Sequence, residues 1–148
     1  MSSSKVPKVV IDTNVLIAAT RNKESFSRKI INMAVNGDIL PYATRKVLDE
    51  NRALLEKAVS WQDELIDRYF TVVQEVVEKY DLKVVDIDPE DDKYINAALS
   101  AGAEYIITSD KHLLFYDKYE NINIVSPKKF YEDMVGESFF DWDEWRFS

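Results

Sequence analysis

The sequence predicts an α/β fold in which a parallel sheet carries helices on both faces. Short apolar runs typical of buried strands alternate with longer segments that repeat apolar residues at helical spacing. The sequence contains no segment with the character of a linker and no internal repeat. The 148 residues suit one compact domain. Strands that alternate with helices favour a parallel sheet, because each helix carries the chain back across the sheet to start the next strand.

Five short segments have the character of strands. The first contains the uninterrupted apolar run Val9–Ile11, which is typical of a strand buried on both faces. Pro41 in the second indicates a strand end or an exposed position, because proline cannot donate to a sheet ladder. The predicted strands are Lys8–Ile11, Ile39–Tyr42, Lys83–Ile87, Tyr105–Thr108 and Asn121–Val125.

The remaining segments carry helix signals. Thr44 is a good N-cap, and Asp88-Pro89 pairs an N-cap with a first helical proline. Asn36-Gly37 is a stop signal. The predicted helices are Val15–Ala19 opened by Thr13 or Asn14, Ser25–Val35, Thr44–Ala58, Trp61–Tyr80, one from Asp88-Pro89 to Gly102, and one from Ser126-Pro127 to Val135.

Composition excludes several kinds of chemistry. The chain has no cysteine, so it has no disulfide, no thiolate zinc site and no thiol nucleophile. Its one histidine, His112, excludes a pair of catalytic histidines and a multi-histidine metal site. Hydrolytic chemistry would therefore depend on carboxylates, hydroxyls or lysines. No apolar stretch reaches the ~20 residues of a membrane span, and no secretion signal opens the sequence, so we expect a cytoplasmic protein.

The net charge of −8 argues at first against a nucleic-acid partner. However, acids that are clustered around a metal count toward this total and are neutralised when the cation binds. Local basic pairs also remain, and the sequence leaves open whether they line one groove. These pairs are Arg21 with Lys23, Arg28-Lys29, Arg45-Lys46 and Lys128-Lys129.

Four acidic residues lie at the edges of separate apolar segments: Asp12, Glu50, Asp92 and Asp110. Asp12 and Asp110 directly follow predicted strands, and in α/β sheets ligands bind outside the carboxyl ends of the strands. Converged carboxylates repel one another unless a hard cation lies between them. The pattern therefore indicates a Mg²⁺ or Mn²⁺ site. Asn14, Thr108 and Ser109 are close enough in sequence to support it by hydrogen bonding.

Each acid also has an ordinary interpretation. Asp12 can be a helix cap, Glu50 a solvated helix residue, and Asp110 the cap of the turn that contains His112. His112 itself is more typical of a turn or a surface than of a catalytic base. Of the acids at the start of the helix near Pro89, we favour Asp92 over the adjacent Asp91, because Asp92 shares a helix face with Ile95 and Leu99.

Several segments together resemble the PIN domain family of metal-dependent ribonucleases. Asp-Thr-Asn after the first strand and Thr-Ser-Asp at the end of the fourth are fairly specific as a pair, and weak alone. The resemblance extends from about Lys8 to about Tyr131. It rests on Val9–Ile17, Thr44–Glu50, Asp88–Tyr94 with Ala97-Ala98, and Ile107–Leu114.

The resemblance implies a three-layer α/β/α sandwich with a five-stranded parallel sheet. It implies an endoribonuclease that uses Mg²⁺ or Mn²⁺ and leaves a 5′-phosphate. Many small members are toxins of toxin–antitoxin pairs, often homodimers, and the wording Ser-Asp-Lys-His-Leu-Leu is similar to a VapC-like branch. RNA as substrate and an antitoxin protein as partner follow from this resemblance. Its implied catalytic and metal-binding quartet is Asp12, Glu50, Asp92 and Asp110, with Asn14 and Thr108 in support.

Two other functions stay open at this point. One is a metal-dependent phosphohydrolase of small phosphate esters. A phosphatase with an aspartate nucleophile, however, requires a second acid two residues after the first, and this position is Asn14. The other is a domain of the same fold that binds RNA or protein without cutting. We expect residues 1–136 to form the nuclease domain and residues 137–148 an acidic, aromatic tail. The tail is expected to pack on its own domain or on a dimer mate; the alternative is that it docks a partner or covers the rim of the active site.

Overall fold

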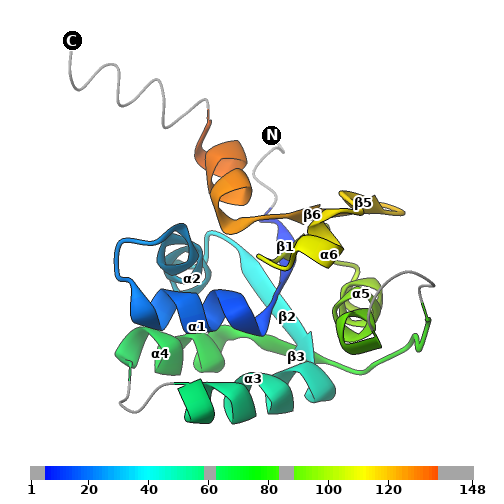
Figure 1. Ribbon diagram of the computed structural model, residues 1–148, viewed down its shortest axis with the longest axis horizontal. Helices are drawn as coiled ribbons and strands as arrows, with labels where there is room; N and C mark the ends of the chain where they lie inside the picture. The colour runs from blue at the N-terminus through cyan, green and yellow to red at the C-terminus, as the bar shows by residue number, and fades with distance from the viewer. Residues whose placement is uncertain (1–5, 59–62, 84–88, 137–148) are drawn as a thin grey trace.

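The computed structural model describes residues 6–58, 63–83 and 89–136. In these ranges a six-stranded sheet of order β3-β2-β1-β4-β6-β5 carries helices on both faces (Figure 1). Every strand pair is parallel except β5 with β6. The strands are β1 (Lys8–Ile11), β2 (Leu40–Thr44), β3 (Gln74–Val76), β4 (Tyr105–Ile107), β5 (Lys118–Tyr119) and β6 (Ile122–Val125). The predicted α/β sandwich is confirmed, with six strands in place of five.

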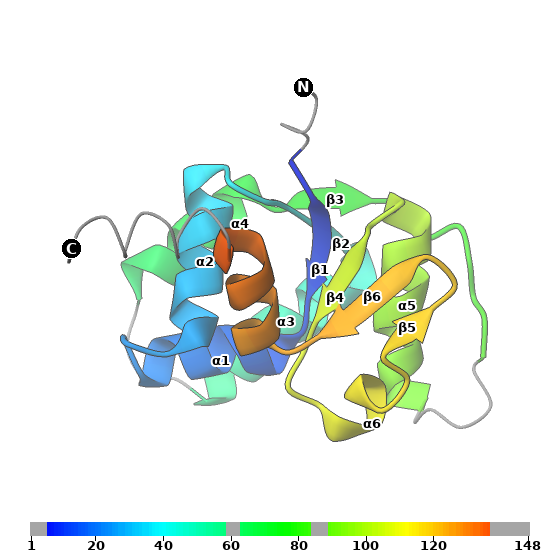
Figure 2. The same cartoon turned by 90° about the horizontal axis from the view of Figure 1, so that it is seen from above.

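The helices provide the two outer layers. Figure 2 shows α2 and the helix over residues 127–136 on one side of the strands and α5 on the other. The helices are α1 (Thr13–Arg21), α2 (Phe26–Asn36), α3 (Arg45–Ala58), α4 (Glu64–Val72), α5 (Pro89–Ala101), α6 (Lys111–Leu114) and the helix over residues 127–136.

Alternation along the central strands builds a core on each face of the sheet. Val9 and Ile11 of β1 pack in one apolar cluster with residues of α1, α2 and α4, whereas Val10 packs in a second cluster with residues of α3 and α5. Ile107 and Ile106 of β4 divide between the two clusters in the same way. Successive side chains of a strand point to opposite faces, so an apolar run without polar interruption is what a sheet covered on both sides requires.

Several predicted helix ends are observed with their hydrogen bonds. The Thr44 hydroxyl accepts from the Val47 amide at 3.3 Å, before α3, and the Ser126 hydroxyl accepts from the Lys129 amide at 3.1 Å. Gly37 ends α2 with φ of 85°, a left-handed conformation that glycine adopts without steric cost.

The predicted helix Trp61–Tyr80 is wrong in its second half. Helix α4 ends at Val72, and Gln74–Val76 instead form β3, which pairs with β2 at the sheet edge. The apolar residues do recur at helical spacing there, but the valines of this stretch are β-branched and favour a strand once a sheet edge is available. The predicted strand Lys83–Ile87 (beyond Lys83), the Asp88 cap and the tail 137–148 lie outside the described residues.

An ion pair joins α2 to the start of α4. Arg28 contacts the Asp63 carboxylate at 2.6 Å, and the side chain of Asp63 is 4% exposed. Asp63 also caps α4 by accepting from the Leu65 amide at 3.0 Å. We predict that Asp63→Ala lowers the free energy of unfolding by about 3 kcal/mol, because it leaves a half-buried guanidinium without its partner and removes a cap.

Chemical denaturation of Asp63→Ala beside Asp67→Ala measures this effect. Asp67 is an exposed acid of the same helix, so we expect its variant to stay within about 0.5 kcal/mol of the wild type. Equal stabilities for the two variants would show that the Arg28–Asp63 pair contributes nothing.

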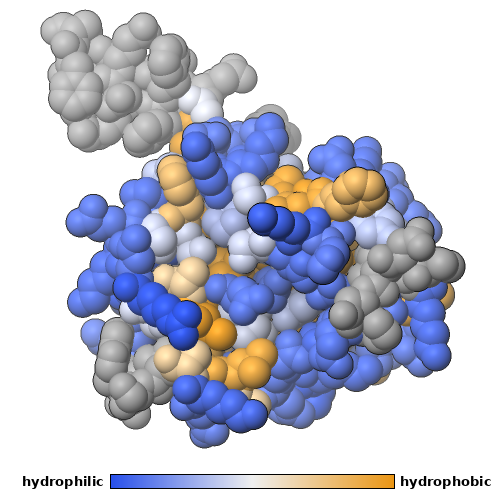
Figure 3. All heavy atoms as spheres, in the orientation of Figure 1, coloured by the Kyte–Doolittle hydropathy of each residue, from blue (hydrophilic) through white to orange (hydrophobic). Residues whose placement is uncertain are grey.

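The described helices are all too short or too polar to cross a lipid bilayer. The face of the molecule drawn in Figure 3 is mostly hydrophilic, and its hydrophobic side chains form small, separate patches.

Candidate metal centre

The first and fourth strands bring two of the predicted acids to one rim of the sheet. Strands β1 and β4 are adjacent and parallel, with Ile11 opposite Ile107, and Asp12 and Asp110 follow them. The Asp12 amide extends the ladder by donating to the Ile107 carbonyl at 3.0 Å. β2 lies on the other side of β1 and β6 on the other side of β4, so this rim is a switch point of the kind where α/β sheets bind ligands.

Thr108 connects the two acids. Its buried hydroxyl donates to Asp12 Oδ2 at 2.6 Å and accepts from the Asp110 amide at 3.0 Å. One side chain therefore fixes both the orientation of the Asp12 carboxylate and the position of the backbone that carries Asp110. Of the other predicted supporting residues, Asn14 lines the pocket described below, whereas Ser109 is exposed and is not among the described residues of its wall.

Both aspartates are also helix caps, as their ordinary interpretation predicted. Asp12 Oδ1 accepts from the Asn14 amide at 3.2 Å at the start of α1, and Asp110 Oδ1 accepts from the His112 amide at 2.8 Å at the start of α6. Capping does not compete with a functional role, because an ionised carboxylate has two acceptor oxygens with about four lone-pair sites. The caps instead hold the two carboxylates in place.

A pocket of ≈ 320 Å³ opens at this rim. Its walls come from Asp12 after β1, from α1, α3 and α5, and from Asp110 before α6. Five of the lining side chains are acidic and one, Lys93, is basic, so the pocket is strongly negative. The lining residues are Asp12, Thr13, Asn14, Glu50, Ala53, Leu54, Glu90, Asp91, Lys93, Tyr94 and Asp110.

Helix α5 presents Asp91 to the pocket, whereas Asp92, which we favoured from the sequence, is not among the residues described as lining it. Asp91 is buried and lines the wall, whereas Asp92 is half-buried and is not among the lining residues described. We chose Asp92 by its shared face with Ile95, but Asp91 lies one turn before Tyr94 and Ile95 and also meets that face. Residues 93–98 of α5 are all buried, so apolar spacing does not separate the two acids.

The donor set fits a hard divalent cation. Asp91, Asp110 and His112 each offer a ligand atom, and these three atoms lie within 4.8 Å of one another. Asp12 faces the same pocket. Carboxylate oxygens are the ligands that Mg²⁺ and Mn²⁺ prefer, and an imidazole is compatible with Mn²⁺. His112 is otherwise exposed in the first turn of α6, as predicted, with Nδ1 at 3.5 Å from Asp110 Oδ1.

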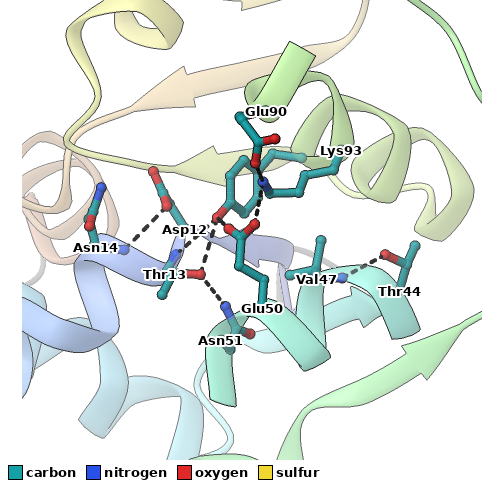
Figure 4. A network of polar contacts seen from close by, with 10 residues as sticks. Asp12, Thr13, Asn14, Thr44, Val47, Glu50, Asn51, Glu90 and Lys93 are labelled. Carbon is teal, nitrogen blue, oxygen red and sulfur yellow. Dashed lines mark hydrogen bonds and ion pairs between the residues drawn. The ribbon is translucent and has the colours of Figure 1, made fainter. Parts of the chain in front are cut away.

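Glu50, on α3, also lines the pocket and is held by side chains of α5 (Figure 4). Its Oε1 contacts Lys93 Nζ at 2.5 Å, and its Oε2 accepts from the Tyr94 hydroxyl at 3.1 Å. Burial lowers the pKa of Lys93, but hydrogen bonds to Glu50 and Glu90 and the negative charges of these two side chains together outweigh it and raise the pKa above its usual value. Burial and the nearby Asp12 charge raise the pKa of Tyr94, so this phenol stays protonated and able to donate.

Two further polar residues continue this contact chain into the core. The Tyr94 oxygen, which donates to Glu50, lies 3.2 Å from the Thr13 hydroxyl, and Asn51 Nδ2 donates to the Thr13 hydroxyl at 2.5 Å. Because Glu50 can only accept, the Tyr94 oxygen is left to accept from Thr13. The fully buried Asn51 retains one oxygen without a partner among the described residues.

Five further residues of this pocket and its contact chain were not predicted from the sequence: Thr13, Asn51, Glu90, Lys93 and Tyr94. A signal for Asn51 existed, because it interrupts the apolar stripe of α3 at four residues from both Val47 and Leu55. Lys93 and Tyr94 are three residues after Glu90 and Asp91, a spacing that groups all four at the start of one helix.

The family of this chain follows from its similarity to known proteins. The family model described as PIN domain matches residues 8–112, which include Asp12, Glu50, Asp91 and Asp110. This chain belongs to the PIN domain family. PIN domains are typically metal-dependent nucleases, and the acidic cluster of this PIN domain is able to hold a metal ion. The chain is also 30% identical over 141 residues to the uncharacterized protein MJ1680 of Methanocaldococcus jannaschii, covering 85% of this chain and 90% of that protein.

Proposed function

We propose that this PIN domain is an endoribonuclease that hydrolyses RNA phosphodiester bonds with Mg²⁺ or Mn²⁺. The observation that carries the proposal is the meeting of Asp12, Asp91 and Asp110 in one pocket, from three elements distant in sequence. Oxygen donors gathered in a negative, partly open pocket are what phosphoryl chemistry with a divalent ion requires. A bound ion would offset charge on the phosphate and activate water for attack.

The protein's own part is to hold the reacting groups in place. Thr108 and the two helix caps fix the carboxylates of Asp12 and Asp110, and Lys93 and Tyr94 fix that of Glu50. Such support costs no rearrangement during the reaction, because the groups are already positioned. Glu50 lines the same pocket and is placed to orient a water or the RNA.

The basic residues named in the sequence analysis support RNA binding only in part. Arg28 pairs with Asp63, Arg45 with Glu75 and Asp49, and Lys129 with Asp133. The other members of the four pairs are exposed and have no ion pair within the described ranges, so they are candidates for phosphate contacts: Arg21, Lys23, Lys29, Lys46 and Lys128.

A toxin role within a toxin–antitoxin pair is the finer part of the proposal. Its support is the similarity of Ser109–Leu114 to the toxin-type branch of the family. A toxin of this kind would act as a homodimer and be silenced by an antitoxin protein that covers the acidic pocket.

Incubation of the purified protein with end-labelled single-stranded RNAs tests the proposed activity. We expect cleavage with Mn²⁺ or Mg²⁺, internal cut sites, 5′-phosphate ends and no cleavage in EDTA. DNA of the same sequences and a phosphomonoester substrate run in parallel, so that a general nuclease or a small-molecule phosphohydrolase is detected. RNA that is retained without any metal-dependent product would support a binding module and contradict the nuclease.

A further inference from the structure

The pocket contains a buried cation of its own. The ammonium of Lys93 lies 2.5 Å from Glu50 Oε1 and 2.9 Å from Glu90 Oε1, and the side chain of Lys93 is only 8% exposed. A lysine is almost never buried unless it is paired. Lys93 is therefore a fixed positive charge on one wall of a pocket whose other charges are negative (Figure 4).

Glu50 is already balanced by this arrangement. Each of its carboxylate oxygens has a donor from α5: Lys93 on Oε1 and Tyr94 on Oε2. The positive charge of Lys93 offsets the repulsion between the Glu50 carboxylate and the other acids of the pocket. Without this charge, that repulsion would favour a divalent ion beside Glu50. Displacing Lys93 to admit an ion would leave its ammonium buried without this partner, which is costly.

Asp12 and Asp110 have no lysine or arginine partner of this kind among the described residues. Asp12 accepts from a hydroxyl and a backbone amide, and Asp110 accepts from a backbone amide. Within the described part of the chain, neither acid forms an ion pair with a lysine or an arginine, and the Asp110 pair with His112 involves an imidazole that is 82% exposed. The carboxylates of Asp12 and Asp110 are thus the ones that lack a basic partner within the described residues, and Asp110 lies in the cluster with Asp91 and His112.

We propose that Lys93 is the resident cation of Glu50, so that the pocket takes one divalent ion, held among Asp12, Asp91 and Asp110, and Glu50 is not a metal ligand. This inference deepens the proposed function and rests on the metal site which that function requires. It makes Lys93 a positioning residue, which keeps Glu50 oriented and occupies the place where a second ion would bind.

Titration with Mn²⁺ alone, by calorimetry and by the electron paramagnetic resonance signal of free Mn²⁺, measures the number of ions bound. We expect one ion for the wild-type chain and for Lys93→Arg, which retains the charge. We expect two ions for Lys93→Met, because Glu50 and Glu90 then lose their cation. Lys129→Met is the matched control, since Lys129 pairs with Asp133 on an exposed face at 3.4 Å, and it should bind one ion.

Glu50→Gln provides a second measurement that does not depend on the folding of Lys93→Met. We expect it to bind one ion, with an affinity lowered by no more than about tenfold, as for a residue outside the coordination sphere. The site of binding is read from His112, the one histidine of the chain, whose imidazole proton resonances should broaden at low Mn²⁺ concentration.

The outcomes separate this inference from the proposed function. Two ions bound to the wild-type chain, one ion bound to a folded Lys93→Met, or no ion bound to Glu50→Gln would each overturn the inference. If two ions bind and RNA is cut, the nuclease proposal survives without it. If one ion binds as described and no RNA is cut, the inference survives and the nuclease proposal does not. Failure of the wild-type chain to bind Mn²⁺ would overturn both.

Discussion

Asp91→Asn is expected to lower kcat/KM for metal-dependent RNA cleavage by at least about 100-fold, whereas Asp92→Asn is expected to change it by less than about threefold. The reason is the direction of two adjacent side chains on α5. Asp91 lies on the pocket wall within reach of Asp110 and His112, and Asp92 does not line the pocket. Replacing Asp91 therefore removes a donor for the cation, while replacing Asp92 leaves the donor set intact.

Cleavage rates of the two variants, measured at saturating Mn²⁺ with matched thermal melts, check this prediction. The variants make the same chemical change at neighbouring positions of one helix, so each is the control for the other. A greater loss of activity in Asp92→Asn than in Asp91→Asn would reverse the assignment that the pocket supports.

Asp12→Asn is expected to reduce cleavage by a similar factor, at least about 100-fold, with a change in the free energy of unfolding below about 1 kcal/mol. Asparagine caps a helix about as well as aspartate, so the hydrogen bond from the Asn14 amide is retained at the start of α1. The amide of asparagine lacks the charge that binds a divalent ion and orients differently toward Thr108. Activity and stability should therefore separate at this position.

Chemical denaturation and RNA cleavage assays of Asp12→Asn and Thr108→Val together test that separation. Thr108→Val removes the hydroxyl that donates to the buried Asp12 carboxylate and accepts from the amide of the half-buried Asp110, so both groups lose this partner. It should destabilise the fold by about 1–3 kcal/mol and reduce cleavage by about tenfold. An Asp12→Asn variant that unfolds, or one that cuts RNA at the wild-type rate, would show that Asp12 serves the fold alone.

Much of the fold followed from local signals in the sequence. The central strands β1 and β4, the caps at Thr44 and Ser126, and the stop at Gly37 are all as predicted, because each depends on residues close together in the chain. The stretch after Val72 was mispredicted because its apolar spacing suits a helix, whereas pairing with the distant strand β2 makes part of it a strand. Tertiary contacts override local preference where that preference is weak.

The candidate site also contains residues that local sequence signals predict and residues that they do not. Asp12 and Asp110 were predictable because they directly follow strands, and parallel strands bring their carboxyl ends to one rim. Asp91 was not distinguishable from Asp92, because α5 is buried over most of its circumference and its apolar residues mark no single inward face. The role of Lys93 was not predictable, since it depends on Glu50, which lies 43 positions earlier in the chain on another helix.

The sequence by itself determined the α/β class, the strand ends that carry Asp12 and Asp110, and the absence of thiol chemistry. Only the tertiary structure decided which acid of α5 enters the pocket and that Glu50 faces a buried lysine. The physical reason is that backbone periodicity and capping act within a few residues, whereas the direction of a side chain on a buried helix is set by the neighbours against which that helix packs.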